Sequence, residues 1–242
     1  MPSSLSPAYV LHSRPFRDTS ALVDLLTLHQ GLQRVVWRGA RSQRKGLTPQ
    51  AFMPLMVSFV GKGELKTLAQ AEVAGSYRLL QGENLFSGLY LNELLVRLAP
   101  PGDPQPLLFA AYQDAIERLA TAATVEPVLR QFEWLLLDIL GYGFSLQHDA
   151  AGQAIEPELR YAWHAEQGLV LLDALAVEKG QGLSGQALLS MAGGAWDEAG
   201  TLRAAKQLMR QALAAHLGDR PLMSRQLFSR QSTPMPEVKD SD

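Results

Sequence analysis

The stretch SALVDLLTLHQGLQRVVWRGARSQRK, residues 20–45, holds two β-type runs followed by a dense group of basic residues. Gly31 separates the runs, and glycine is a common turn residue between strands. Arginine beside an exposed aromatic such as Trp37 suits a phosphate backbone whose bases can stack. A solvated strand and loop rich in arginine is the alternative interpretation. The basic residues of this segment are Arg34, Arg38, Arg41, Arg44 and Lys45.

Working outward, residues 8–73 contain five β-type runs, at 8–14, 20–28, 32–39, 55–61 and 65–73. Turn residues stand between them, and we expect a hairpin turn at Gly63-Glu64. Five short strands in about 70 residues fit a small barrel or a sandwich. A barrel with a basic face suits single-stranded nucleic acid, although many such barrels bind other ligands.

From about residue 80 the apolar residues recur at helical spacing. This predicts helices over 85–99, 107–123, 127–140, 184–192 and 199–218. An irregular insert at about 144–180 includes a predicted hairpin, 159–166 with 168–172. The expected fold class is α+β, with a barrel domain at 1–80, an α-helical domain at 81–230 and a flexible tail at 231–242.

The charge of the chain is unevenly distributed, although the net charge of the 242 residues is only −2. Residues 1–80 carry ten Lys and Arg against four Asp and Glu, whereas residues 81–200 carry five against sixteen. Residues 201–230 are basic again, with six against one. A basic segment on each side of an acidic one indicates a polyanionic partner that is contacted at both ends.

Further basic side chains are candidates for phosphate contacts in both halves of the chain. Arg203, Lys206 and Arg210 are spaced by three and four residues, so they share one helix face, although simple solubility would explain them equally. In the first domain Phe16 joins Trp37 as a candidate for stacking, although either side chain could equally lie in the core. About five neutralised phosphates would give a log–log salt slope of about −3.5. The other candidate phosphate contacts are Arg14, Arg17, Lys62, Lys66 and Arg225.

Motifs of enzymes are weak in this chain. Residues 180–185 match G-x-G-x-x-G, but the strands and helices of a dinucleotide-binding unit are not predicted around them, so we interpret a glycine-rich turn into a helix. His164-Ala-Glu166 resembles half of a zinc deaminase motif whose other half needs cysteines, and the chain has none. We therefore expect no enzymatic activity, no cofactor and no metal site. The absence of cysteine also fits a reducing cytosol, and no run approaches the ~18 apolar residues of a membrane span.

The chain resembles the RecO family of bacterial recombination mediator proteins. The matching segments are 8–27, 37–46, 50–72, 86–100, 129–143, 201–213 and 217–228, and they occur in the family's order. The resemblance implies an N-terminal OB-fold barrel followed by an α-helical domain with a small insert. Some members carry a four-cysteine zinc site in this insert, which this chain lacks.

The resemblance also implies a function in DNA repair and recombination in the bacterial cytoplasm, at the nucleoid. Members bind single- and double-stranded DNA, anneal complementary strands without ATP and act with RecR to load RecA onto strands covered by the single-stranded DNA-binding protein SSB. Several bind the acidic, apolar C-terminal tail of SSB. Arg130, in LRQFEWLLL, is the position expected to pair with the terminal carboxylate of that tail. Pairing of Arg130 with Glu126 or Glu133 is the alternative.

Two rival functions remain open from the sequence. An OB-fold adaptor that binds only proteins would show no salt-dependent affinity for DNA. An enzyme that uses the turn at Gly180 for a nucleotide would show saturable nucleotide binding.

Overall fold

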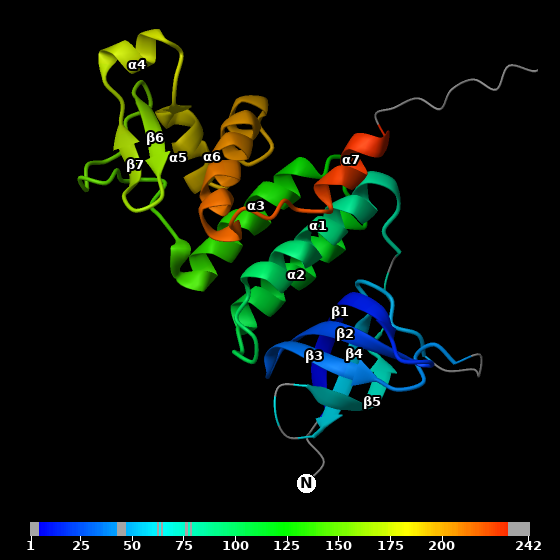
Figure 1. Cartoon of the computed structure of the whole chain (residues 1–242). Helices are drawn as coiled ribbons and strands as arrows, with labels where there is room; N and C mark the ends of the chain where they lie inside the picture. The colour runs from blue at the N-terminus through cyan, green and yellow to red at the C-terminus, as the bar shows by residue number, and fades with distance from the viewer. Residues whose placement is uncertain are drawn as a thin grey trace, which may run out of the picture.

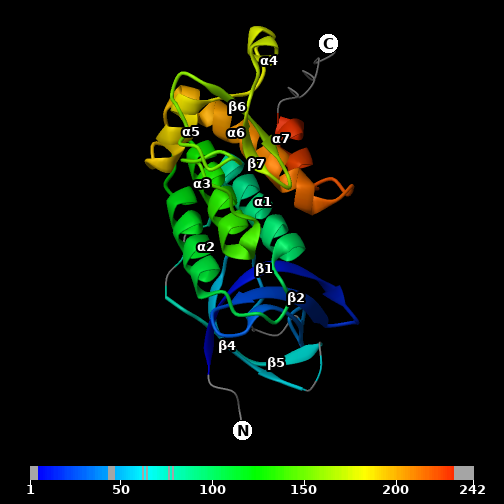
Figure 2. The same ribbon diagram turned by 90° about the vertical axis from the view of Figure 1, so that its left-hand side faces the viewer.

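The computed structural model describes residues 5–42, 47–61, 63, 65–75, 77 and 79–231. A barrel formed by the N-terminal strands lies at one end, helices occupy the middle, and a small hairpin with its own short helices lies at the other end (Figures 1 and 2). The expected α+β fold class, with an OB-type barrel followed by helices, is confirmed.

The barrel closes in the strand order β1-β2-β3-β5-β4, with β3 and β5 parallel and the other pairs antiparallel. Alternate residues of these strands point inward, so that apolar side chains such as Val23, Leu25 and Val35 fill the barrel. The strands are β1 (Ser6–Phe16), β2 (Ser20–Thr27), β3 (Gly31–Trp37), β4 (Pro54–Val60) and β5 (Lys66–Val73).

The helical half packs its apolar faces into one core, to which the outer face of the barrel also contributes. After α3 the chain makes a π-helical turn, Asp138–Tyr142, in which Gly141 has a φ of 82°. The main helices are α1 (Gly82–Leu98), α2 (Pro106–Leu119), α3 (Glu126–Leu137), α6 (Ala199–Leu217) and α7 (Arg225–Gln231). The sequence did not predict α7, which is short and lies at the end of the predicted α-helical domain.

The insert contains the predicted hairpin, formed by β6 (Arg160–His164) and β7 (Gly168–Leu171). A third, two-residue strand, β8 (Leu183–Ser184), pairs antiparallel with β6 and leads into α5 (Gly185–Ala192). The short helix α4 (Ala174–Glu178) was not predicted. Ser184 is at the N-cap of α5, but its side chain makes no capping hydrogen bond.

The barrel and the helical half are in close contact. Tyr9 of β1 packs on Phe109 and Tyr112 of α2, with ring centroids 5.4 and 5.3 Å apart. At Gly31, whose φ is 64°, a Cβ atom would lie 2.0 Å from the backbone oxygen of Asp103. Only glycine therefore allows the β2–β3 turn to approach the α1–α2 loop so closely.

The barrel ends at Val73, and α1 begins at Gly82. The separate domains predicted for residues 1–80 and 81–230 stay a prediction, and residues 232–242 of the predicted tail lie outside the described residues. Among the helices of the described part, none is long and apolar enough to cross a membrane.

Candidate nucleic-acid interface

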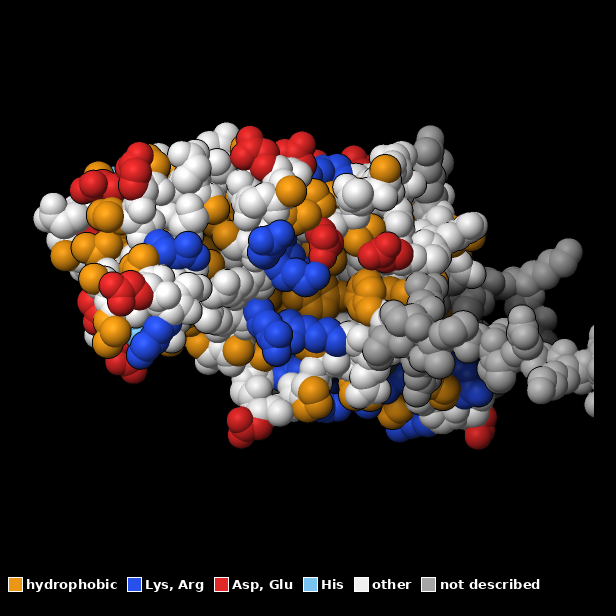
Figure 3. All heavy atoms as spheres, turned by 90° about the horizontal axis from the view of Figure 1, so that it is seen from above, with side chains coloured by type: hydrophobic (Ala, Val, Ile, Leu, Met, Phe, Trp, Pro, Cys, Tyr) orange, Lys and Arg blue, Asp and Glu red, His pale blue; other side chains and the backbone are white. Residues whose placement is uncertain are grey.

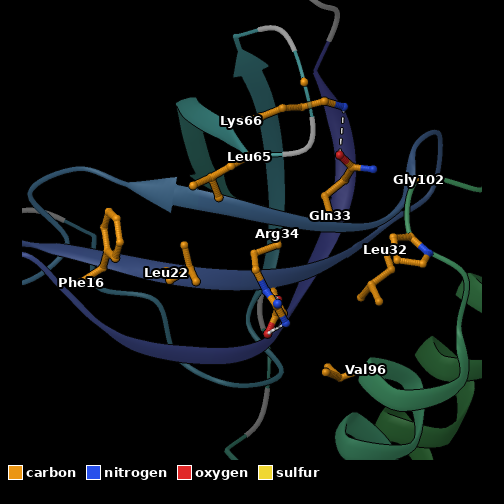
Figure 4. A pocket seen from close by; sticks show the side chains of 12 residues that line it. Phe16, Leu22, Leu32, Gln33, Arg34, Leu65, Lys66, Val96 and Gly102 are labelled. Carbon is orange, nitrogen blue, oxygen red and sulfur yellow. Dashed lines mark hydrogen bonds and ion pairs between the residues drawn. The ribbon is translucent and has the colours of Figure 1, made fainter.

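A hollow of about 830 Å³ lies over β2 and β3, where the barrel meets the helical half. Figure 4 shows Phe16 and Leu22 at one end, Arg34 near the middle, and Val96 on the helical side. A second hollow of about 460 Å³ includes Arg17, Arg38 and Thr67. Phe16 and Leu65 line both hollows, so the two adjoin. We call the two hollows together the barrel groove.

Four of the predicted phosphate contacts line the barrel groove, namely Arg17, Arg34, Arg38 and Lys66. Arg41 is exposed near its edge, where its Nη1 donates a hydrogen bond of 3.4 Å to the backbone oxygen of Arg17. Arg14 is also exposed, but it lines neither hollow. The predicted contacts Arg44, Lys45 and Lys62 lie outside the described residues.

Arg34 is partly neutralised, because it faces an acid across the sheet. Arg34 and Asp24 are direct cross-strand partners in the β2–β3 ladder, and Arg34 Nε donates a hydrogen bond of 2.6 Å to Asp24 Oδ1. This hydrogen bond raises the pKa of the Arg34 guanidinium above its ordinary value. His12 approaches the same carboxylate, at 3.8 Å. Arg34 therefore attracts a phosphate less strongly than a free arginine would.

Lys66 makes its hydrogen bonds to neutral side chains, so these partners do not offset its charge. Its ammonium donates hydrogen bonds of 3.1 Å to Gln30 Oε1 and 2.9 Å to Gln33 Oε1. These amides orient the lysine on the wall of the barrel groove without cancelling its charge.

The expectation that Trp37 is exposed for stacking is wrong. Its side chain is 7% exposed and lies in the barrel core with Val35 and Phe59. The reason is the period of the strand, because Trp37 is two residues from inward-facing Val35, whereas Arg34 and Arg38 have the opposite parity. Phe16 is partly exposed and lines the barrel groove, with the Arg17 guanidinium 5.2 Å from its ring centroid.

A separate hollow of about 480 Å³ lies in the helical half, and we call it the helical hollow. Its lining combines cations with apolar and aromatic side chains. Figure 3 shows Lys and Arg side chains gathered around hydrophobic ones on the face seen from above, with Asp and Glu side chains beside them. Lys206 at its rim is 2.6 Å from Glu126 Oε1. The lining residues are Glu83, Tyr90, Val125, Glu126, Leu129, Arg130, Lys206, Arg210, Arg225 and Phe228.

The helical hollow brings Arg130, the predicted contact of the SSB tail, together with Lys206, Arg210 and Arg225, which are predicted contacts of DNA phosphates. Arg203 is exposed on the same helix as Lys206, but it does not line the hollow. Three separate helices, α3, α6 and α7, contribute the four cations. One site can therefore attract either DNA phosphates or an acidic peptide.

Arg130 pairs with Glu133, as the alternative interpretation proposed. Its Nη1 is 2.7 Å from Glu133 Oε2, and Tyr90 donates a hydrogen bond of 2.5 Å to Glu133 Oε1. Burial raises the pKa of the Glu133 carboxyl and, together with the charge of Glu133, that of the Tyr90 hydroxyl. Glu126, the other acid considered, pairs with Lys206 instead.

Gly180 and Gly182 lie in the turn between α4 and β8, and Gly185 is the first residue of α5, in agreement with the interpretation as a turn that leads into a helix. At Gly185 a Cβ atom would lie 1.9 Å from the backbone oxygen of Glu156, so close packing explains this glycine. The strand that precedes α5 is antiparallel to its neighbour, unlike that of a dinucleotide-binding unit. Within the described ranges, no group of three or more His, Asp and Glu residues could hold a metal ion.

Comparison with known proteins identifies the family. Residues 1–77 match the family model "Recombination protein O N terminal", and residues 79–226 match "Recombination protein O C terminal". The chain belongs to the RecO family of DNA repair proteins. It is 53% identical to DNA repair protein RecO of Pseudomonas paraeruginosa, over 91% of this chain and 92% of the relative. The RecO proteins of Stutzerimonas stutzeri and Pseudomonas putida strain W619 are 50% and 48% identical, over 92% of this chain and 92% and 96% of the relatives.

Several residues at the two candidate sites of this RecO chain were not singled out from its sequence. Leu65 and Asp24 were missed in the barrel groove, and Tyr90, Leu129 and Phe228 in the helical hollow. The strand alternation of β2 could have placed Asp24 on the outer face, but its pairing with Arg34 depends on the register between β2 and β3. For Tyr90 and Phe228 the sequence carries no comparable signal, because aromatic residues at helical spacing ordinarily fill a core.

Proposed function

We propose that this protein binds single- and double-stranded DNA and anneals complementary strands without ATP, within DNA repair by homologous recombination. The barrel groove is the observation that supports this proposal most directly. It runs past β3 between Arg38 and Lys66, with the ring of Phe16 and the half-exposed Leu65 at its centre. Cations along the path of a backbone, with a ring for stacking, are what a single strand requires.

Annealing by this protein needs no chemical step. Cations on the barrel and on α6 would neutralise phosphates of two strands and so lower the repulsion that opposes their encounter. Base pairing then supplies both the sequence specificity and the favourable free energy. The DNA partner implies work in the bacterial cytoplasm, at the nucleoid. Family membership further supports joint action with RecR in the loading of RecA, with no enzymatic activity and no cofactor.

We assign the helical hollow to the C-terminal tail of SSB. Four cations beside the apolar side chains of Val125 and Leu129 suit a peptide that is both acidic and apolar. The guanidinium of Arg130 would contact the terminal carboxylate, since a planar fork of N–H donors matches a carboxylate. Lys206, Arg210 and Arg225 would attract the acidic side chains before it.

The salt dependence of DNA binding measures the number of phosphate contacts. Arg17, Arg38, Arg41 and Lys66 have no acidic ion-pair partner among the described residues, whereas Arg34 has Asp24. Four such cations predict a log–log slope of about −2.8 for a short single strand, shallower than the five contacts expected from sequence alone.

The decisive experiment measures the annealing of two complementary labelled oligonucleotides coated with cognate SSB in the absence of ATP. Energy transfer between the two labels reports the annealing. We expect acceleration by the wild-type chain and loss of acceleration in the double variant Arg38→Glu, Arg41→Glu. Lys179→Glu is the matched control, because Lys179 is an exposed cation of the acidic insert. Normal annealing by a folded double variant would refute the assignment of the barrel groove as the DNA-binding site. No annealing by the wild-type chain would favour an adaptor that binds only proteins.

A further inference from the structure

A complete ion pair is buried at the floor of the helical hollow. The side chain of Glu133 is 0% exposed, and Arg130 is 9% exposed. Removing two charges from water costs more than their attraction returns in many proteins, so apolar residues would serve stability at least as well. Packing alone therefore gives no reason for an acid at this position.

Arg130 retains hydrogen-bonding capacity that its own surroundings do not use. Its Nη1 faces Glu133, but its buried Nε has no hydrogen-bond partner among the described residues. An unpaired buried donor is costly, so the surroundings of Arg130 do not fully satisfy its guanidinium. The Nε is closed off from the hollow, but Arg130 lines the hollow and 11% of its side chain is exposed, so a ligand there can reach the exposed edge of the guanidinium.

Glu133 is itself held from its other side. The Tyr90 hydroxyl donates to Glu133 Oε1, while Arg130 lies against Oε2. Tyr90 belongs to α1, whereas Arg130 and Glu133 are one helical turn apart on α3. Tyr90 thus holds the carboxylate in place, and Glu133 Oε2 restrains the position of the guanidinium through the ion pair, without a hydrogen bond among the described residues.

The same carboxylate changes the balance of charge. Glu133 cancels the charge of Arg130, so general attraction for anions comes from the exposed Lys206, Arg210 and Arg225. Arg130 contributes a planar fork of N–H donors, and this fork matches a planar carboxylate better than a phosphate of a flexible DNA backbone. The cations at the rim of the hollow therefore attract anions in general, and Arg130 at the floor recognises the shape of a carboxylate.

We propose that Glu133 is a positioning residue that makes the helical hollow prefer a peptide carrying a free terminal carboxylate over DNA. This inference rests on the proposed function of the hollow as the site for the SSB tail. Glu133 acts through Arg130 and does not contact the ligand.

The test compares two labelled peptides that copy the last nine residues of cognate SSB, one with a free carboxylate and one amidated at its C-terminus. Affinity is measured by fluorescence anisotropy, with a labelled single-stranded oligonucleotide as the third ligand. We expect the wild-type chain to prefer the free acid about tenfold, the value of one charge-assisted hydrogen bond. In Glu133→Gln that preference disappears, while affinity for the oligonucleotide does not fall.

Glu126→Gln is the matched control, because it removes an acid from the rim of the same hollow without touching Arg130. It should keep the preference for the free acid and bind all three ligands at least as tightly. Arg130→Lys keeps the cation but loses the planar fork of N–H donors, so it should also lose the preference for the free acid. The double variant Arg130→Lys, Glu133→Gln should show no further loss of that preference. If Glu133→Gln does not fold, Arg130→Lys replaces it in the test.

Each contrary outcome is distinct. A folded Glu133→Gln chain that still prefers the free acid overturns the role of Glu133. Parallel loss of peptide and oligonucleotide binding would show a structural role only. If the wild-type chain binds neither peptide, the assignment of the hollow to the SSB tail fails instead.

Discussion

The side-chain amide of Asn92 donates a hydrogen bond of 2.8 Å to the backbone oxygen of Leu11, and this contact joins α1 to strand β1. The β1–β2 register shifts between Val10 and His12, so Leu11 lies in a bulge without a direct partner in that ladder. Tyr112 of α2 donates a further hydrogen bond of 2.7 Å to Asn92 Oδ1. One buried amide thus completes an irregular strand and fixes the barrel against two helices.

Asn92→Ala should destabilise the protein, because it leaves the Leu11 carbonyl and the Tyr112 hydroxyl without partners in a buried interface. We expect a loss of about 1–3 kcal/mol for each group left unpaired. Urea unfolding followed by circular dichroism measures it. Gln113→Ala, on the exposed face of α2, should stay within about 0.5 kcal/mol of the wild type. Equal stability of the two variants would show that the amide is unimportant.

Substitution of Trp37 should lower the stability of the protein, whereas substitution of Phe16 should lower its affinity for DNA. Trp37→Ala removes a ring from the barrel core and should cost about 3–5 kcal/mol of stability. Phe16→Ala leaves that core intact and should weaken single-strand binding by about 1–3 kcal/mol, the contribution of one stacked base. Thermal unfolding measures the stability of both variants, and oligonucleotide titration measures their affinity for single-stranded DNA. Wild-type affinity in Phe16→Ala would exclude stacking on this ring.

Asp24→Asn should strengthen DNA binding, since it releases Arg34 from its ion pair. One additional phosphate contact would make the log–log salt slope steeper by about 0.7. The measurement is oligonucleotide affinity over a series of salt concentrations. Asp114→Asn is the control, because Asp114 pairs with Arg118 at 3.2 Å on α2. An unchanged slope in Asp24→Asn would place Arg34 outside the path of the DNA.

Glu93 should make the attachment of α7 dependent on pH. Burial alone would raise the pKa of Glu93, but hydrogen bonds from Ser224 and from the backbone N–H of Met223 outweigh it, so the pKa lies below its ordinary value of 4.5. A lowered folded-state pKa means that this contribution is complete above about pH 5.5 and is lost as the pH falls below about 4.5.

The stability difference between the wild type and Glu93→Gln should therefore shrink as the pH falls. Thermal unfolding midpoints between about pH 7 and pH 3.5 measure it. Glu117→Gln, on the exposed face of α2, should match the wild type throughout. A difference for Glu93→Gln that is constant over this range would contradict the assignment.

Much of the architecture follows from local sequence patterns. The β-type runs at 20–28 and 32–39, which are bounded by turn residues, identify strands, and the change to helical spacing after residue 80 identifies helices. Trp37 shows the limit of reading single residues from their neighbours in the sequence. It has the same strand parity as Val35, so it lies inside the barrel although basic residues flank it.

Local patterns also account for the elements that were missed. The helices α4 and α7 have five and seven residues, too few to show a helical period. The position of α7 depends instead on Glu93, which is distant in sequence and accepts hydrogen bonds from residues just before that helix.

By itself the sequence determined the order of strands and helices, the segregation of charge and the candidate cations. Tertiary structure alone decided that Asp24 restrains Arg34, and that Arg130, Lys206 and Arg225 share one hollow above a buried Glu133. The physical reason is that the period of an element shows which side is buried, but not which other element covers it. That choice is made by packing between segments far apart in the chain, and it is this packing that formed the two candidate sites.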